Sequence, residues 1–152
     1  EPDAFSLAKG LGSGYPISAI VSNEKLAEGF LTHLKETEGQ IERIDQLVER
    51  GKLKLQRMKC KAMEGLVEEG NEVVKEIEEG PVRDAMLIAG AQKVEHYEIA
   101  SYGTLVELAK KLGYREAAQL LAETLEEEKA TDEKLNMIAI KEINDEAMQM
   151  AA

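Results

Sequence analysis

The spacing of apolar residues after residue 22 predicts a chain made of helices. An α-helix has about 3.6 residues per turn, so apolar residues that recur every three or four positions share one face. Ser22 or Asn23 offers an N-cap for the first such segment, and Gly51 offers its end. This pattern predicts a long helix over residues 23–51. Its inward stripe consists of Leu26, Phe30, Leu34, Thr37, Ile41, Ile44 and Val48.

Three more helical segments follow a basic connection at residues 52–61. A short helix is predicted at about residues 60–79, and Gly80 and Pro81 then stop one helix and start the next. The following helix reaches Leu112 before Gly113, and the last runs from about residue 115 to about residue 150. The sequence therefore predicts an all-α bundle. The apolar side of the short helix consists of Met63, Leu66, Val67, Val73, Val74 and Ile77.

Residues 1–21 differ from the rest of the chain. Residues 8–16 alone hold three of the twelve glycines and one of the three prolines. Inside a helix these four residues would cost about 6 kcal/mol in helix propensity. We therefore predict a loop here, and we divide the chain into an atypical leader at residues 1–21 and a helical bundle domain at residues 22–152.

Composition narrows the class of protein and its partners. The chain has 152 residues, of which 43% are hydrophobic and 32% charged, and it has no Trp, as is typical of a soluble bundle packed by Leu, Ile and Ala. The net charge of -11 argues against nucleic acid and anionic membrane as partners and favours cations. Cys60 is the only cysteine, and no apolar run approaches the roughly 18 residues of a membrane span. We expect a cytoplasmic protein.

Two carboxylates lie on the inward face of the helix predicted at residues 81–112. Burying a carboxylate without a partner costs roughly several kcal/mol, so Glu95 and Glu98 need protons, cations or a metal ion. The alternative is a half-buried face from which both acids reach water. The complete face consists of Ile88, Ala91, Glu95, Glu98, Tyr102 and Leu105.

Acids also occur at mid-length on two other helices. His33, Glu36 and Gln40 share one flank of the first helix, and such a group is most often a solvated surface. In the last helix Glu128 lies on the inward line, and Asp132 follows one turn later. Two members of the acidic run at residues 126–128 must face outward whatever the phase, so the run itself is not informative. The inward line consists of Ala117, Leu121, Thr124, Glu128, Thr131, Leu135 and Ile138.

A helical bundle that gathers carboxylates at one level is the arrangement of di-iron and di-manganese proteins. No Glu-x-x-His motif is present, and His33 and His96 differ in phase from the acids, so we expect these histidines to support the ligands or to fill the core. We expect Glu95, Glu98 and Glu128 to share one coordination sphere. The predicted ligands of iron or manganese are Glu36, Gln40, Glu95, Glu98, Glu128 and Asp132.

The chain resembles the YciF family of bacterial, ferritin-like stress proteins over about residues 22–140. The likeness rests on HLKETEGQIERI at residues 33–44, KCKAMEGL at residues 59–66, QKVEHYEIASYG at residues 92–103 and ETLEEEKATD at residues 123–132. The resemblance implies a ferritin-like four-helix bundle with an additional short helix, a dinuclear metal site, a homodimer and induction under stress. It implies no particular reaction.

The leader departs from that family, in which a first bundle helix brings a further ligand Glu. Here no acid lies between Asp3 and Glu24. Residues 2–21 instead resemble the cofactor-lysine segment of class III pyridoxal-phosphate aminotransferases, which would make Lys9 the Schiff-base lysine. The rest of that machinery is absent, so we expect no pyridoxal catalysis and interpret the segment as foreign, fused or misassigned. A continuous helix over residues 3–21 would favour misassignment.

Two functions stay open from the sequence. The first is a non-haem metal protein that stores, detoxifies or oxidises iron. Since only three helices supply acids, we expect this protein to bind one metal ion tightly per chain and a second one weakly. The second is a metal-independent helical stress or scaffold protein with an interaction role, whose acids are protonated or salt-bridged.

Overall fold

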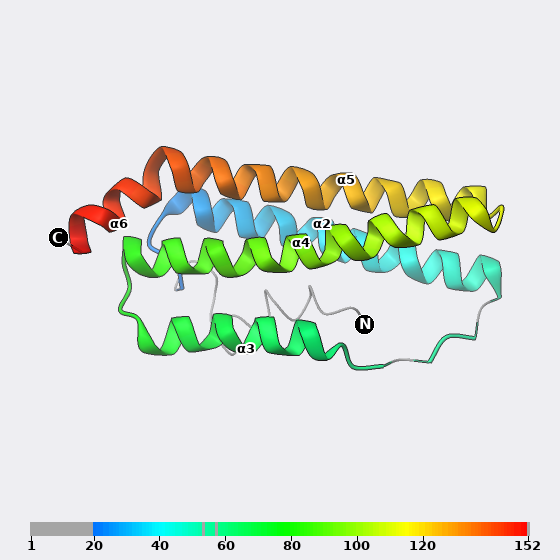
Figure 1. The fold of residues 1–152 in the computed structure, drawn as a ribbon, viewed down its shortest axis with the longest axis horizontal. Coiled ribbons are helices and arrows are strands. Elements are labelled where there is room, and N and C mark those ends of the chain that lie inside the picture. Colours follow the sequence, from blue (N-terminus) through cyan, green and yellow to red (C-terminus); the bar gives the residue numbers. More distant parts are fainter. Residues whose placement is uncertain (1–19, 53, 57, 152) are drawn as a thin grey trace.

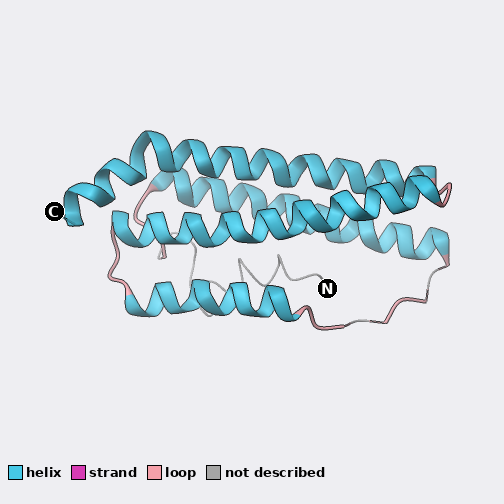
Figure 2. Ribbon diagram, viewed as in Figure 1, coloured by secondary structure: helices cyan, strands magenta, loops and turns pink. Residues whose placement is uncertain are grey.

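The computed structural model describes residues 20–52, 54–56 and 58–151. The predictions made for residues 1–19, including the loop and the resemblance around Lys9, lie outside these residues. The described elements are α2 (Glu24–Gly51), α3 (Lys61–Glu76), α4 (Pro81–Lys111), α5 (Arg115–Ile138), a π-helical turn η2 (Ala139–Ile143) and α6 (Asn144–Ala151). The prediction of an all-α fold is confirmed, because the described residues form helices and loops without strands (Figure 2).

Three long helices form the body of the molecule. α2, α4 and α5 run side by side along the long axis, and the shorter α3 lies along α4 (Figure 1). A long connection carries the chain from the end of α2 to the start of α3. Within the described residues, none of the helices combines the length and the apolar character that crossing a membrane requires.

The helix ends follow the predicted signals at most positions. The side chain of Asn23 accepts a hydrogen bond from the backbone nitrogen of Leu26 at 3.1 Å, which caps the start of α2. Lys52 follows the end of α2 with φ 49°, and its backbone nitrogen donates to the carbonyl of Glu49. α3 ends at Glu76, somewhat earlier than predicted.

The last predicted helix is not continuous. The π-helical turn η2 separates α5 from α6, and the chain changes direction there (Figure 1). A π-helical turn adds a residue to the helical repeat, and its first and last residues, Ala139 and Ile143, are both buried. The apolar spacing along the chain did not predict this turn, whose buried residues belong to the core cluster.

The apolar core lies at the end of the bundle where α2 and α4 begin. The inward face predicted for α4 is confirmed except at Leu105, which is 45% exposed. Val106 takes the inward position instead, since it lies four residues after the buried Tyr102 and turns closer to the same face. The buried core residues are Ile20, Val21, Leu26, Leu87, Ile88, Ala91, Leu135, Ala139 and Ile143.

A buried carboxylate joins the start of α2 to α4. Asp84 is fully buried, and it accepts hydrogen bonds from the Ser22 hydroxyl at 2.7 Å and from the backbone nitrogens of Ser22 and Asn23 at 3.0 and 2.9 Å. These donors stand at the N-terminal end of a helix, where negative charge is favourable. Asp84 therefore shows how this fold stabilises a buried acid with protein donors.

We expect Asp84→Ala to lower the free energy of unfolding by about 2–4 kcal/mol, because two backbone N–H groups lose a charged acceptor in a buried place. Urea denaturation measures this change. Asp45→Ala is the matched control, since Asp45 is exposed on α2 and its loss should cost less than about 0.5 kcal/mol. Equal losses in the two variants would contradict this role of Asp84.

Candidate metal centre

Four side chains from three helices converge at mid-bundle. They are His33 from α2, Glu95 and Glu98 from α4 and Glu128 from α5, and each offers one ligand atom within 4.8 Å of the others. Nε2 of His33 lies 3.3 Å from Oε1 of Glu95 and 3.5 Å from Oε2 of Glu128. The convergence expected for Glu95, Glu98 and Glu128 is observed, and His33 joins them.

The three acids are buried and poorly satisfied. Glu128 is 0% exposed, and neither of its carboxylate oxygens has a hydrogen-bond partner. Oε2 of Glu95 and Oε2 of Glu98 are also buried without a partner. Asp84, in contrast, has protein donors for both oxygens. A buried charged oxygen without a partner is costly, so these acids need a cation or protons in addition to the contacts that Nε2 of His33 makes with Glu95 and Glu128.

Burial makes ionisation of these acids unfavourable. Burial raises the pKa of Glu98 from 4.5 to about 8, and the charge of Glu128 adds to the increase. Burial likewise raises the pKa of Glu95 far above its usual value, with Glu128 and Glu98 as further causes. The pKa of the Tyr102 phenol is also raised, first by burial and then by the charges of Glu98 and Glu128. Without a cation, the cluster therefore retains protons at neutral pH.

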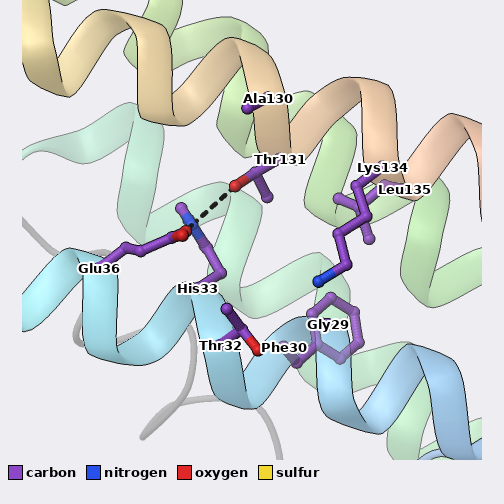
Figure 3. Close-up of a pocket in the computed structure, with 9 residues that line it drawn as sticks. All are labelled: Gly29, Phe30, Thr32, His33, Glu36, Ala130, Thr131, Lys134 and Leu135. Atoms are coloured by element: carbon purple, nitrogen blue, oxygen red, sulfur yellow. Dashed lines mark hydrogen bonds and ion pairs between the residues drawn. The ribbon is translucent and has the colours of Figure 1, made fainter.

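The imidazole of His33 connects the cluster to the α2–α5 interface. Its Nδ1 lies 3.0 Å from the hydroxyl oxygen of Thr131 and 3.3 Å from Oε2 of Glu36, and both side chains point toward the ring in Figure 3. When Nδ1 carries the proton and donates it to either oxygen, the lone pair of Nε2 faces Glu95 and Glu128. Metal-binding histidines are commonly oriented in this way through their other nitrogen.

The donor set fits a divalent metal ion. Four ligand atoms placed about 2.1 Å from one ion in a tetrahedron are about 3.4 Å apart, close to the separations observed around His33 Nε2. Three carboxylates and one imidazole are donors that suit iron and manganese. The oxygens without partners belong to the same three acids that would coordinate the ion.

The structure places the other predicted ligands outside this group. Glu36 lies beyond His33, on the side away from the cluster. Gln40 is buried, but its amide nitrogen donates to Oε2 of Glu127 at 3.2 Å. Asp132 accepts from Nε2 of Gln92 at 3.0 Å. His96 is largely exposed, and its Nε2 lies 3.4 Å from the Asp132 carboxylate.

A polar network next to the cluster was not predicted. Arg43 donates to both carboxylate oxygens of Glu127 at 2.8 and 2.9 Å and to the hydroxyl of Thr124 at 2.6 Å. These bonds lower the pKa of Glu127, first through the hydrogen bond from Arg43. Glu127 is therefore half-buried between α2 and α5 rather than fully outward. The signal in the sequence was Arg43 on the same flank as Glu36 and Gln40.

Sequence and structure comparisons find close relatives. Residues 16–148 match a family described as "Domain of unknown function (DUF892)". Protein YciF of Escherichia coli strain K12 is 60% identical over 151 residues, which cover 98% of this chain and 91% of that protein.

Two solved structures share the fold. The crystal structure of the E. coli stress protein YciF matches with a TM-score of 0.83 and 61% identity, over 92% of this chain and 87% of the other. YcfI from Rhodopseudomonas palustris, provisionally described as a structural protein, matches with a TM-score of 0.78 and 40% identity, over 87% and 82% of the two chains.

Proposed function

The chain belongs to the YciF family of stress proteins (DUF892), and we propose that it holds an iron or manganese ion inside its helical bundle. The observation that carries the proposal is the group of His33, Glu95, Glu98 and Glu128, which brings four ligand atoms together while four carboxylate oxygens lack hydrogen-bond partners. Asp84 shows that this chain can satisfy a buried acid with its own donors where no ion is needed.

The residues of the site have separate roles. Nε2 of His33 and one oxygen from each acid would bind the ion, and a bound iron or manganese ion supplies redox chemistry toward oxygen or peroxide. The three carboxylates would offset the charge of the ion, and their burial would keep bulk water away from it. Thr131 and Glu36 hold the imidazole so that Nε2 faces the acids.

The donor set also supports an unequal pair of metal positions. One ion can use the imidazole and three carboxylate oxygens, whereas a second must share the remaining oxygens of the same acids, with no other imidazole in the group. Ferritin-like dinuclear centres draw ligands from four helices, and the described group draws on three. We infer sequestration of iron with slow oxidation, because two ions would rarely be bound together.

Metal analysis tests the function. Protein purified without chelators should contain about one iron or manganese ion per chain, and titration of stripped protein should show one tight site followed by a weaker one. Oxygen consumption with added ferrous iron should be slow. Two equivalent tight sites with rapid iron oxidation would contradict the unequal pair, and the absence of any tight site would contradict metal binding altogether.

A metal-independent interaction role is the second candidate. It is favoured by apolar side chains at the end of the bundle where α2 ends and α5 begins, where Leu55, Leu105 and Tyr114 are exposed around a hollow of about 490 Å³. The related YcfI is described in structural rather than enzymatic terms. A homodimer that covers this surface, in the cytoplasm, is the form we propose for such a role. The same titration separates the two functions, since this one needs no metal.

A further inference from the structure

A small pocket opens between α2 and α5 directly beside the candidate metal centre. Its volume is about 80 Å³. A single water needs about 10–15 Å³ by the same measure, so the pocket can hold an ion with part of its hydration shell. Figure 3 shows His33 and Glu36 on one side and Lys134 reaching across from α5. The lining residues are Gly29, Phe30, Thr32, His33, Glu36, Ala130, Thr131, Lys134 and Leu135.

His33 belongs both to the pocket and to the metal group. Its Nε2 lies near Glu95 and Glu128, and its Nδ1 lies near Thr131 and Glu36 on the pocket side. The other members of the group are almost fully buried. Among the described residues, the imidazole is therefore the member of the group that lines this opening, and a change of its rotamer would join the pocket to the carboxylates.

Two neighbouring positions at the interfaces of α5 are occupied by hydrogen-bonded side chains. One and two turns after Glu36 on α2, Gln40 and Arg43 bind Glu127, and the guanidinium group would repel an approaching cation. At the α4–α5 interface, the amide of Gln92 binds Asp132. At the pocket itself, small side chains at Gly29 and Ala130 leave space, and the half-exposed Glu36 carboxylate supplies negative charge.

We propose that this pocket is the route by which a divalent metal ion enters and leaves the buried site, with Glu36 attracting the ion and the Lys134 ammonium group opposing it. The proposal rests on the metal-binding function proposed above. It assigns Glu36 to the path of the ion rather than to its final coordination, which agrees with its position beyond His33.

Binding rates of Co²⁺ test the route. The chain has four Tyr and no Trp, so quenching of tyrosine fluorescence in a stopped-flow instrument reports binding near Tyr102. A unit charge about 8 Å from a divalent cation in water changes the electrostatic energy of the cation enough to alter its association rate about fivefold. Lys134→Met should therefore speed association about fivefold and Glu36→Gln should slow it about fivefold. Dissociation rates should change in the same direction, so the equilibrium constant should change less than the rates.

Matched controls separate local from general effects. Lys111→Met changes the net charge equally at the far end of α4, and its association rate should stay within about 1.5-fold of the wild type because the charge is distant and screened. Gly29→Val should slow association by narrowing the pocket, whereas Gly90→Val, at a half-buried helical glycine with no atom within 4 Å of an added Cβ, should not.

The possible results distinguish failure of the proposed entry route from failure of the proposed metal binding. Wild-type protein that binds Co²⁺ tightly, with pocket variants that behave like their controls, would overturn the route and leave metal binding intact. An equilibrium affinity that falls with Glu36→Gln while the rate of association is unchanged would make Glu36 a ligand and would also overturn it. Wild-type protein that binds no Co²⁺ would overturn the metal function on which the route depends.

Discussion

Replacing Glu128 by glutamine should weaken tight metal binding by at least about 100-fold. Glu128 is completely buried, it lies next to His33 Nε2, and both of its oxygens lack partners in the protein. Glutamine has nearly the same size but carries no charge, so the ion loses a negative ligand without a large change in packing. Isothermal titration of metal-free protein with Mn²⁺ measures the loss.

Glu126→Gln is the control for this variant. It makes the same change of charge two residues away, but Glu126 is exposed and pairs with Lys129. We expect its Mn²⁺ affinity to stay within about twofold of the wild type, because an exposed pair contributes little. Unchanged affinity in Glu128→Gln would show that the buried acids do not bind the ion. Equal losses in both variants would indicate a nonspecific effect of charge.

The stability of the metal-free protein should fall as the pH rises from about 5 to about 8. Glu98 has a pKa of about 8 in the folded protein, raised first by burial from its ordinary 4.5. Between these two values the folded state holds a proton that the unfolded state has released, so each unit of pH lowers the free energy of unfolding by up to about 1.4 kcal/mol. The contribution of protonated Glu98 is therefore fully present below pH 4.5 and lost by about pH 8.

Comparison with Glu98→Gln isolates this contribution. The variant has no proton to lose at this position, so the wild type should lose about 3–5 kcal/mol relative to it between pH 5 and pH 8. Urea denaturation with a chelator present measures both proteins. Saturating Mn²⁺ should remove the loss in the wild type, because the ion takes the place of the proton. Parallel pH profiles of the two metal-free proteins would contradict a buried, proton-holding Glu98.

Helix phase alone located the buried acids. Glu95, Glu98 and Glu128 share a helix face with residues such as Ile88 and Leu135, and the regular helical repeat fixes that face before any neighbour is known. The N-cap of α2 at Asn23 could be predicted for a similar reason, since it depends only on the residues next to it.

Side-chain positions that depend on contacts with a neighbouring helix could not be predicted from helix phase. His33 lies on a flank of α2. Its ring reaches the cluster only because Glu95 of α4 and Glu128 of α5 lie at the same level along the bundle as His33. Glu127 and Asp132 also lie at the edge of the inward face of α5. Hydrogen bonds with Arg43 and Gln92 determine where their side chains point. The metal ligands assigned from the sequence remain predictions, with His33 added by geometry and Glu36 reassigned to the pocket.

Anomalous X-ray diffraction from crystals grown with Mn²⁺ tests the account most directly. We predict a strong anomalous peak at mid-bundle, about 2.1 Å from Nε2 of His33 and from one oxygen each of Glu95, Glu98 and Glu128. A weaker second peak beside the same acids would agree with unequal positions. Crystals saturated with Mn²⁺ that show no peak among these four side chains, or whose peaks lie only on the acidic surface, would contradict the central claim that this bundle is built to hold a metal ion.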